Sequence, residues 1–117
     1  MSSESISTNE SVIACDLNAI AADQKDQHGV TVRELFSAVQ EAKELSDGYA
    51  FRLPTESATL IKAAEFIANE RLCCPFFEFS IVVTANGGPI WLQLVGNDEV
   101  KKMVRAEFGA LLSSTVA

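Results

Sequence analysis

Two adjacent cysteines carry most of the chemistry that this chain of 117 residues can offer. Cys73 and Cys74 stand immediately before Pro75, and Glu70 precedes the pair by three and four residues. On a helix this spacing places the Glu70 carboxylate on the same side as both thiols, and Arg71, three residues before Cys74, would add a cation. We therefore expect a candidate site at a helix end, in which Glu70 and Arg71 tune the two thiols.

Neighbouring thiols of this kind suit a soft metal or metalloid ion. Cys15 would supply a third sulfur if its segment packs beside the end of the helix. The leading hypothesis is therefore that Cys73 and Cys74, with Cys15 as a third ligand, bind a thiophilic metal, a metalloid or another thiol-reactive ligand. Structural zinc is not favoured, because it needs four tetrahedral ligands and the usual Cys-x-x-Cys pairs are missing, so that His28 or Glu70 would have to serve.

Two other functions remain open. A free cysteine often packs as a small apolar residue, so the chain could be a structural or protein-interaction module whose cysteines belong to the core. A thiol redox protein that cycles Cys73 and Cys74 ranks third, because a vicinal disulfide closes a small strained ring. The negative end of a helix also raises a thiol pKa, which favours a binding protein over an enzyme. His28 lies among polar residues and is expected on the solvated surface.

Net charge and the distribution of apolar residues exclude some classes of binding partner. The net charge is −7, which excludes nucleic acid as a main partner because the basic surface that it requires is missing. The N-terminus has no basic or apolar leader, and no apolar run approaches the roughly 20 residues that span a bilayer. We expect a cytoplasmic protein that does not bind membranes. Three cysteines, an odd number, predict reduced thiols rather than a secreted disulfide framework.

The chain length fits one domain. Residues 1–10 are polar and predict a flexible N-terminal tail, followed by a single α+β domain over residues 11–113. Alternation of apolar residues predicts strands, and apolar residues at helical spacing predict helices. The expected strands are 12–17, 49–53, 76–84 and 90–95, and the expected helices are 31–45, 55–74 and 99–112.

The order of these elements, β-α-β-α-β-β-α, predicts a two-layer α+β domain with a mixed four-stranded sheet. Asn86-Gly87-Gly88 is typical of a hairpin turn and predicts antiparallel pairing of the last two strands. A stripe of Leu60, Ala63, Ala64, Ile67, Arg71 and Cys74 is the expected face of the second helix. An open sheet leaves a face or an edge uncovered, so we expect a homodimer.

Four segments of the chain are distinctive: Ile13-Ala14-Cys15-Asp16-Leu17, the strand from Asp47 to Arg52, Glu70-Arg71-Leu72-Cys73-Cys74-Pro75-Phe76 and Gly88-Pro89-Ile90-Trp91-Leu92. Together they resemble a family of small bacterial proteins without an established activity. The resemblance covers most of the chain after the tail and implies a bacterial, cytoplasmic protein, but no reaction. Cys73-Cys74-Pro75-Phe76 is also similar to short segments of proteins linked to heavy-metal responses.

Overall fold

The computed structural model describes residues 15–112. Its helices are α2 (Lys25–Ser37), α3 (Ser57–Cys73) and α4 (Asp98–Leu112), preceded by the short 3₁₀ helices η2 (Leu17–Ala19) and η3 (Ala22–Gln24). Its strands are β1 (Glu41–Leu45), β2 (Gly48–Leu53), β3 (Glu78–Val83) and β4 (Ile90–Val95). The predicted tail at residues 1–10 lies outside the described residues.

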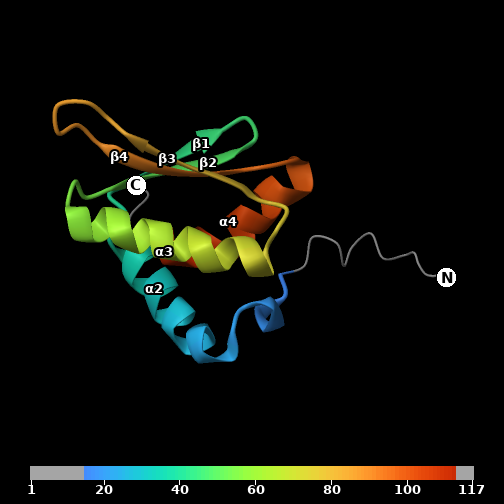
Figure 1. Ribbon diagram of the computed structural model, residues 1–117. Coiled ribbons are helices and arrows are strands. Elements are labelled where there is room, and N and C mark those ends of the chain that lie inside the picture. The colour runs from blue at the N-terminus through green and yellow to red at the C-terminus, as the bar shows by residue number, and fades with distance from the viewer. Residues whose placement is uncertain (1–14, 113–117) are drawn as a thin grey trace.

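The four strands form one sheet in the order β1-β2-β4-β3 (Figure 1). Every neighbouring pair is antiparallel, and Leu92 of β4 lies between Phe51 of β2 and Ile81 of β3. Alternate residues of β4 are buried, as expected for a strand with one face against a core. The α+β class and the four-stranded sheet predicted from the sequence are therefore confirmed.

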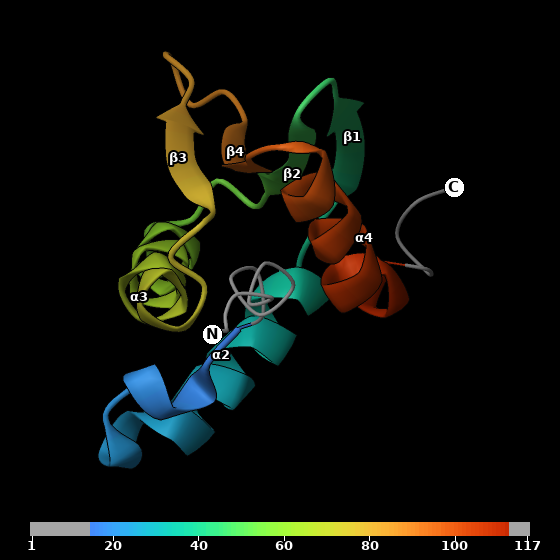
Figure 2. The ribbon, with the colours of Figure 1, turned by 90° about the vertical axis from the view of Figure 1, so that its right-hand side faces the viewer.

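All three helices lie on the same side of the sheet, and α2 packs beneath α3 and α4 (Figures 1 and 2). Four buried phenylalanines join these elements: Phe36 of α2, Phe51 of β2, Phe66 of α3 and Phe108 of α4. The Phe36 ring centroid lies 4.5 Å from that of Phe108 and 5.5 Å from that of Phe66. Because this aromatic cluster fixes how α3 and α4 face each other, it also positions the polar residues beside it on both helices.

The predicted hairpin between β3 and β4 is confirmed. Asn86 and Gly87 both have positive φ angles, 60° and 72°, and the N–H of Gly88 donates to the carbonyl of Ala85 at 3.1 Å. Positive φ at both central residues is the requirement of a type I′ turn, which matches the twist of paired strands. The turn residues thus explain the pairing of β3 with β4.

The predicted helix over residues 31–45 needs correction. The helix α2 begins earlier, at Lys25, and ends at Ser37, while residues 41–45 form the edge strand β1. Residues 41–45, Glu-Ala-Lys-Glu-Leu, have high helix propensity, but pairing of Glu41–Leu45 with β2 overrides it. Charged residues are common on such edges because they discourage pairing with another chain.

The first predicted strand, 12–17, also needs correction where the structure describes it. Leu17 lies in η2, and the Asp16 side chain accepts a hydrogen bond from the N–H of Asn18 at 3.0 Å, so the chain turns here. Residues 12–14 lie outside the described part. Without a strand at this position to run parallel to a neighbour, the sheet is antiparallel throughout rather than mixed, and the described order is α-β-β-α-β-β-α.

The helix α3 ends where the sequence predicts. Cys74 leaves helical geometry with φ −130° and ψ 70°, because the following Pro75 disfavours a helical conformation. At the other end, the N-cap is Glu56 rather than Thr55 or Ser57, and its side chain makes no capping hydrogen bond. None of the helices in residues 15–112 is long and apolar enough to cross a membrane.

Candidate functional site

The C-terminal end of α3 gathers Glu70, Cys73 and Cys74 on the buried side of the helix. Their exposed fractions are 2%, 2% and 0%. The buried residues of α3, which are Ala63, Phe66, Glu70 and Cys73, recur every three or four positions, so Glu70 belongs to the core-facing stripe. Arg71, predicted to share a stripe with Cys74, is exposed instead.

A backbone contact brings the first described residues to this helix end. The N–H of Asp16 donates to the carbonyl of Cys73 at 2.8 Å, and Ile20, a few residues later, is buried in the core. This hydrogen bond uses one of the carbonyls that a helix end leaves without an internal partner. Cys15 therefore lies beside the cysteine pair, as the three-sulfur hypothesis requires.

Cys74 contacts the sulfurs of both other cysteines. Cys15 and Cys74 form a disulfide, and the Sγ atom of the free Cys73 lies 3.5 Å from the Sγ atom of Cys74. The expectation of three reduced thiols is thus corrected, and the disulfide joins Cys74 to Cys15 rather than to Cys73, its partner in the third-ranked redox hypothesis. The disulfide connects residues 59 positions apart, so only the folding of the chain places these cysteines together.

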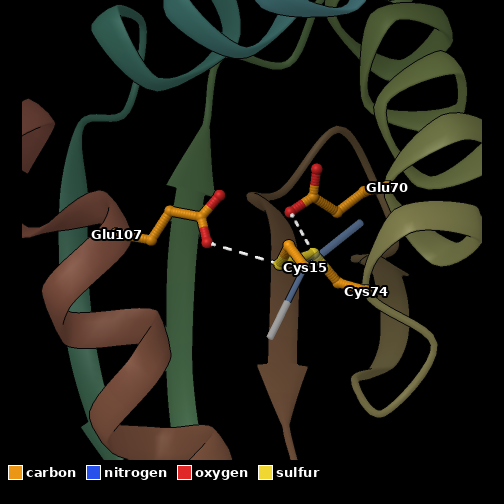
Figure 3. Close-up of side chains that lie close together, drawn as sticks. All are labelled: Cys15, Glu70, Cys74 and Glu107. Atoms are coloured by element: carbon orange, nitrogen blue, oxygen red, sulfur yellow. Dashed lines mark hydrogen bonds between the residues drawn. A yellow bond between two sulfur atoms is a disulfide. The ribbon is translucent and has the colours of Figure 1, made fainter. Parts of the chain in front are cut away.

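Two carboxylates approach the disulfide from opposite sides (Figure 3). Glu70 of α3 places Oε2 3.5 Å from Cys74 Sγ, and Glu107 of α4 places Oε1 3.8 Å from Cys15 Sγ. Disulfide sulfurs carry no proton, so these are contacts in the oxidised protein. Once reduced, each thiol could donate a weak hydrogen bond to the carboxylate beside it.

His28 is buried rather than solvated, which corrects the expectation from its polar neighbours. Its Nε2 lies 2.7 Å from Glu70 Oε1, and its ring stacks on Phe66 with centroids 6.0 Å apart. The helix α2 starts at Lys25, and this places His28, Thr31 and Leu35 on its buried face. Nδ1 of His28 has no hydrogen-bond partner among the residues that the structure describes.

The surroundings keep the free thiol protonated. Burial, and then the charges of Glu70 and Glu107, raise the pKa of Cys73 to about 12. Although Glu107 as a whole is an exposed residue, partial burial of its carboxyl group, and then the charge of Glu70, raise the pKa of Glu107 to about 7, while His28 acts in the opposite direction. Cys73 is therefore a poor nucleophile in this environment, in keeping with its position at a helix C-terminus.

Two overlapping groups of side chains have metal-ligating atoms within 4.8 Å of one another. One contains Cys15, Glu70, Cys74 and Glu107, and the other contains His28, Glu70 and Cys73. Glu70 belongs to both groups. The side chains predicted from the sequence, the three cysteines and Glu70, are thus brought together, and the geometry adds His28 and Glu107.

Arg71 is the exception among the predicted site residues. Among the described residues, no hydrogen bond or ion pair links it to the site, so its tuning role stays a prediction. The helical spacing of His28, Thr31 and Leu35 was a signal in the sequence for His28. Glu107 carries the same kind of signal, because it lies four residues after Met103 and three after Val104 on the apolar stripe of α4. Its contact with Cys15, 92 residues away, has no signature in that spacing.

Comparison of the sequence with protein-family models, with curated proteins and with solved structures finds no match.

Proposed function

We propose that the reduced protein binds one soft, thiophilic metalloid or metal ion through the sulfurs of Cys15, Cys73 and Cys74. The observation that carries this proposal is the meeting of three cysteine sulfurs from two distant segments, with Cys73 Sγ 3.5 Å from Cys74 Sγ and Cys15 bonded to Cys74. Soft ions prefer thiolate ligands, and neighbouring sulfurs can chelate one ion with little rearrangement.

Charge and burial favour a trivalent metalloid over a divalent metal. Arsenite, As(OH)₃, reacts with three thiols to give three As–S bonds, and each thiol proton leaves with a hydroxyl group as water. The product is neutral, which suits a site where Cys73 and Cys74 are buried and Glu70 already places a carboxylate. The raised pKa of Cys73 is no obstacle, because the thiol proton leaves during the reaction.

Glu70 and His28 support the sulfurs in this proposal. Glu70 contacts both Cys73 and Cys74, and its bond to the buried His28 fixes the carboxylate in place. Hydrogen-bonded groups behind the ligands commonly orient them and tune a metal site. For a larger divalent ion such as cadmium, Glu70 could add an oxygen ligand to the three sulfurs.

Titration calorimetry of the reduced protein with arsenite tests the proposal. We expect one arsenite per chain, no binding by the Cys73→Ser, Cys74→Ser double variant, and unchanged binding by Glu65→Gln, an exposed change on the same helix. Cys15→Ser leaves the two buried cysteines in place and should weaken binding roughly a hundredfold or more, since even outer-shell groups contribute 10–100-fold. Equal binding by wild type and the double variant would refute the proposal.

The burial of the cysteines also favours a structural role as a second candidate. Cys73 and Cys74 belong to the hydrophobic core, and a disulfide that spans 59 residues should stabilise the fold by about 4 kcal/mol in the chain-entropy estimate. If the cysteines only pack and cross-link, reduction lowers stability and arsenite does not bind to the reduced protein. The same titration therefore separates the two candidates.

A further inference from the structure

The two sulfurs of the disulfide differ in how far solvent can reach them. Cys15 is half-buried in the irregular segment before η2, whereas Cys74 is fully buried with an exposed fraction of 0%. Thiol–disulfide exchange requires an attacking thiolate to approach one sulfur and displace the other. An external thiol can therefore reach this disulfide only at Cys15, with Cys74 as the leaving sulfur.

We infer that the Cys15–Cys74 disulfide is a directional thiol-exchange site, at which a small external thiol is taken up by Cys15 and reduction opens the ion-binding site. In the first step, the thiol sulfur bonds to Cys15 Sγ, the Cys15–Cys74 bond breaks, and Cys74 takes the proton that the attacking thiol lost. A second thiol then bonds to the first, which releases a small disulfide and leaves Cys15 as a thiol. Two thiols are oxidised and one protein disulfide is reduced.

Cys73 does not compete with this reaction. It lies 3.5 Å from Cys74 Sγ, but it is buried, and attack on Cys74 would close the small strained ring of a vicinal disulfide. The displaced Cys74 consequently remains a thiol next to Cys73. The exchange therefore breaks the Cys15–Cys74 bond, whereas a redox cycle of the vicinal pair would join Cys73 to Cys74.

Reduction also leaves the sulfurs close together. The hydrogen bond from the Asp16 N–H to the Cys73 carbonyl and the burial of Ile20 hold the segment of Cys15 against α3 without the disulfide. Three thiols then face one another, whereas in the oxidised protein two of the sulfurs are bonded to each other and cannot bind an ion as thiolates. This last consequence rests on the proposed function, while the exchange at Cys15 does not depend on it.

Matched variants test the direction of exchange without any ion. Folded Cys74→Ala and Cys15→Ala proteins are incubated with the disulfide of 2-mercaptoethanol, and the modified cysteine is located by peptide mass spectrometry. We expect a mixed disulfide on Cys15 in Cys74→Ala, formed roughly a hundredfold faster than any mixed disulfide on Cys73 or Cys74 in Cys15→Ala. Similar rates in the two variants, or modification of Cys73 before Cys15, would overturn the inference.

Wild type provides a second measurement that needs no variant to fold. The oxidised protein is exposed briefly to 2-mercaptoethanol and quenched with acid, and the trapped mixed disulfide should be on Cys15; trapping on Cys74 overturns the inference.

Arsenite is then titrated into oxidised and reduced wild type, and only the reduced form should bind. Equally tight arsenite binding by the oxidised and reduced forms overturns the inference that reduction opens the ion-binding site. Exchange at Cys15 without arsenite binding in either form supports the exchange and refutes the proposed function instead.

Discussion

Glu70 is the residue around which the site is organised. Its carboxylate lies 2.7 Å from His28 Nε2 and contacts the sulfurs of both Cys73 and Cys74, although its exposed fraction is only 2%. A carboxylate is costly to bury without partners: Oε1 has His28 and the Cys73 thiol beside it, whereas Oε2 contacts Cys74 Sγ, which can donate a hydrogen bond only when the disulfide is reduced. Glu70 therefore links α2 to the sulfur site and sets the electrostatic environment of the thiols.

Replacement of Glu70 by Gln should lower the pKa of Cys73. The charge of Glu70 is the second cause of the raised thiol pKa after burial, so its removal lowers the value while burial keeps it above the ordinary range. Oxidised protein is suited to this test because Cys73 is its one free thiol. The titration is followed by thiolate absorbance, with Glu65→Gln as the control; an unchanged pKa in Glu70→Gln would contradict the assigned cause.

Glu107 should make the oxidised protein less stable as the pH rises from 4.5 to about 7. Its pKa is raised from 4.5 to about 7, so in this window the folded state keeps a proton that the unfolded chain releases, and folding stability falls with rising pH. In Glu107→Gln this contribution disappears, and urea unfolding at several pH values should show a weaker decline than in wild type. Parallel pH profiles for the two proteins would exclude the Glu107 carboxyl group as the source of the decline.

Part of the site could be predicted from single residues and their spacing. The positions of Glu70, Cys73 and Cys74 follow from helical geometry, and the helix end follows from Pro75. The sequence predicts that Cys15 contributes a third sulfur only if its segment packs beside the end of α3, and spacing alone does not show that it does. The expectation that His28 lies on the surface fails because α2 starts earlier than predicted. The apolar stripe of α4 includes the position of Glu107, but the contact of Glu107 with Cys15 depends on how α4 packs beside Phe36 and Phe66.

At the scale of elements, the helices and strands with clear periodicity and turn residues are predicted correctly, and those without such local signals are not. The β3–β4 hairpin and α3 and α4 have clear periodicity and turn residues, and all three were predicted near their observed positions. The sequence of β1 predicts a helix, because residues 41–45 have helix-forming side chains and only their pairing with β2 makes them extended. Strand pairing between distant segments has no local signature in the sequence.

Gly48 is the first residue of β2, and its backbone lies close to that of β4. Substitution of Gly48 tests whether this close approach requires a glycine. A Cβ atom at this position would overlap the carbonyl oxygen of Leu94 and lie 2.8 Å from Val95 Cα, both of them backbone atoms that cannot move aside easily. Gly48→Ala should therefore lower the free energy of unfolding by about 2–3 kcal/mol in urea denaturation.

Gly109 in α4 is the matched control for this substitution. A Cβ atom there meets nothing within 4 Å, so Gly109→Ala should raise the free energy of unfolding by about 0.5–1 kcal/mol through helix propensity. Equal effects of the two substitutions would mean that the close approach of β2 and β4 is not what requires a glycine at position 48.

At the scale of the whole molecule, the disulfide joins the first described segment to the end of α3. The helices cover one side of the sheet (Figure 2). The other side carries residues such as Trp91, its strand partner Val82, and Lys43, whose Nζ lies 4.5 Å from the Trp91 ring centroid. Whether two copies associate, as expected from the sequence, stays a prediction. Under the proposed function, the disulfide would connect the redox state of the protein to ion binding and to stability.

Reduction should destabilise the protein and arsenite should restore much of the loss. Opening a cross-link over 59 residues should lower the free energy of unfolding by about 4 kcal/mol. A ligand that binds only the folded state adds about 2.7 kcal/mol at 100 times its dissociation constant, so arsenite should recover more than half of the loss. Urea unfolding of oxidised, reduced and arsenite-treated protein measures this; no recovery with arsenite would favour the structural role.

The central claim, that three cysteine sulfurs bind one soft ion, is tested most directly by X-ray absorption spectroscopy at the arsenic edge. Reduced wild type loaded with one arsenite per chain should show three sulfur neighbours around arsenic, and Cys15→Ser should show two sulfurs and one oxygen. Arsenic that keeps three oxygen neighbours in wild type, or that shows the same neighbours in Cys15→Ser as in wild type, would contradict the claim.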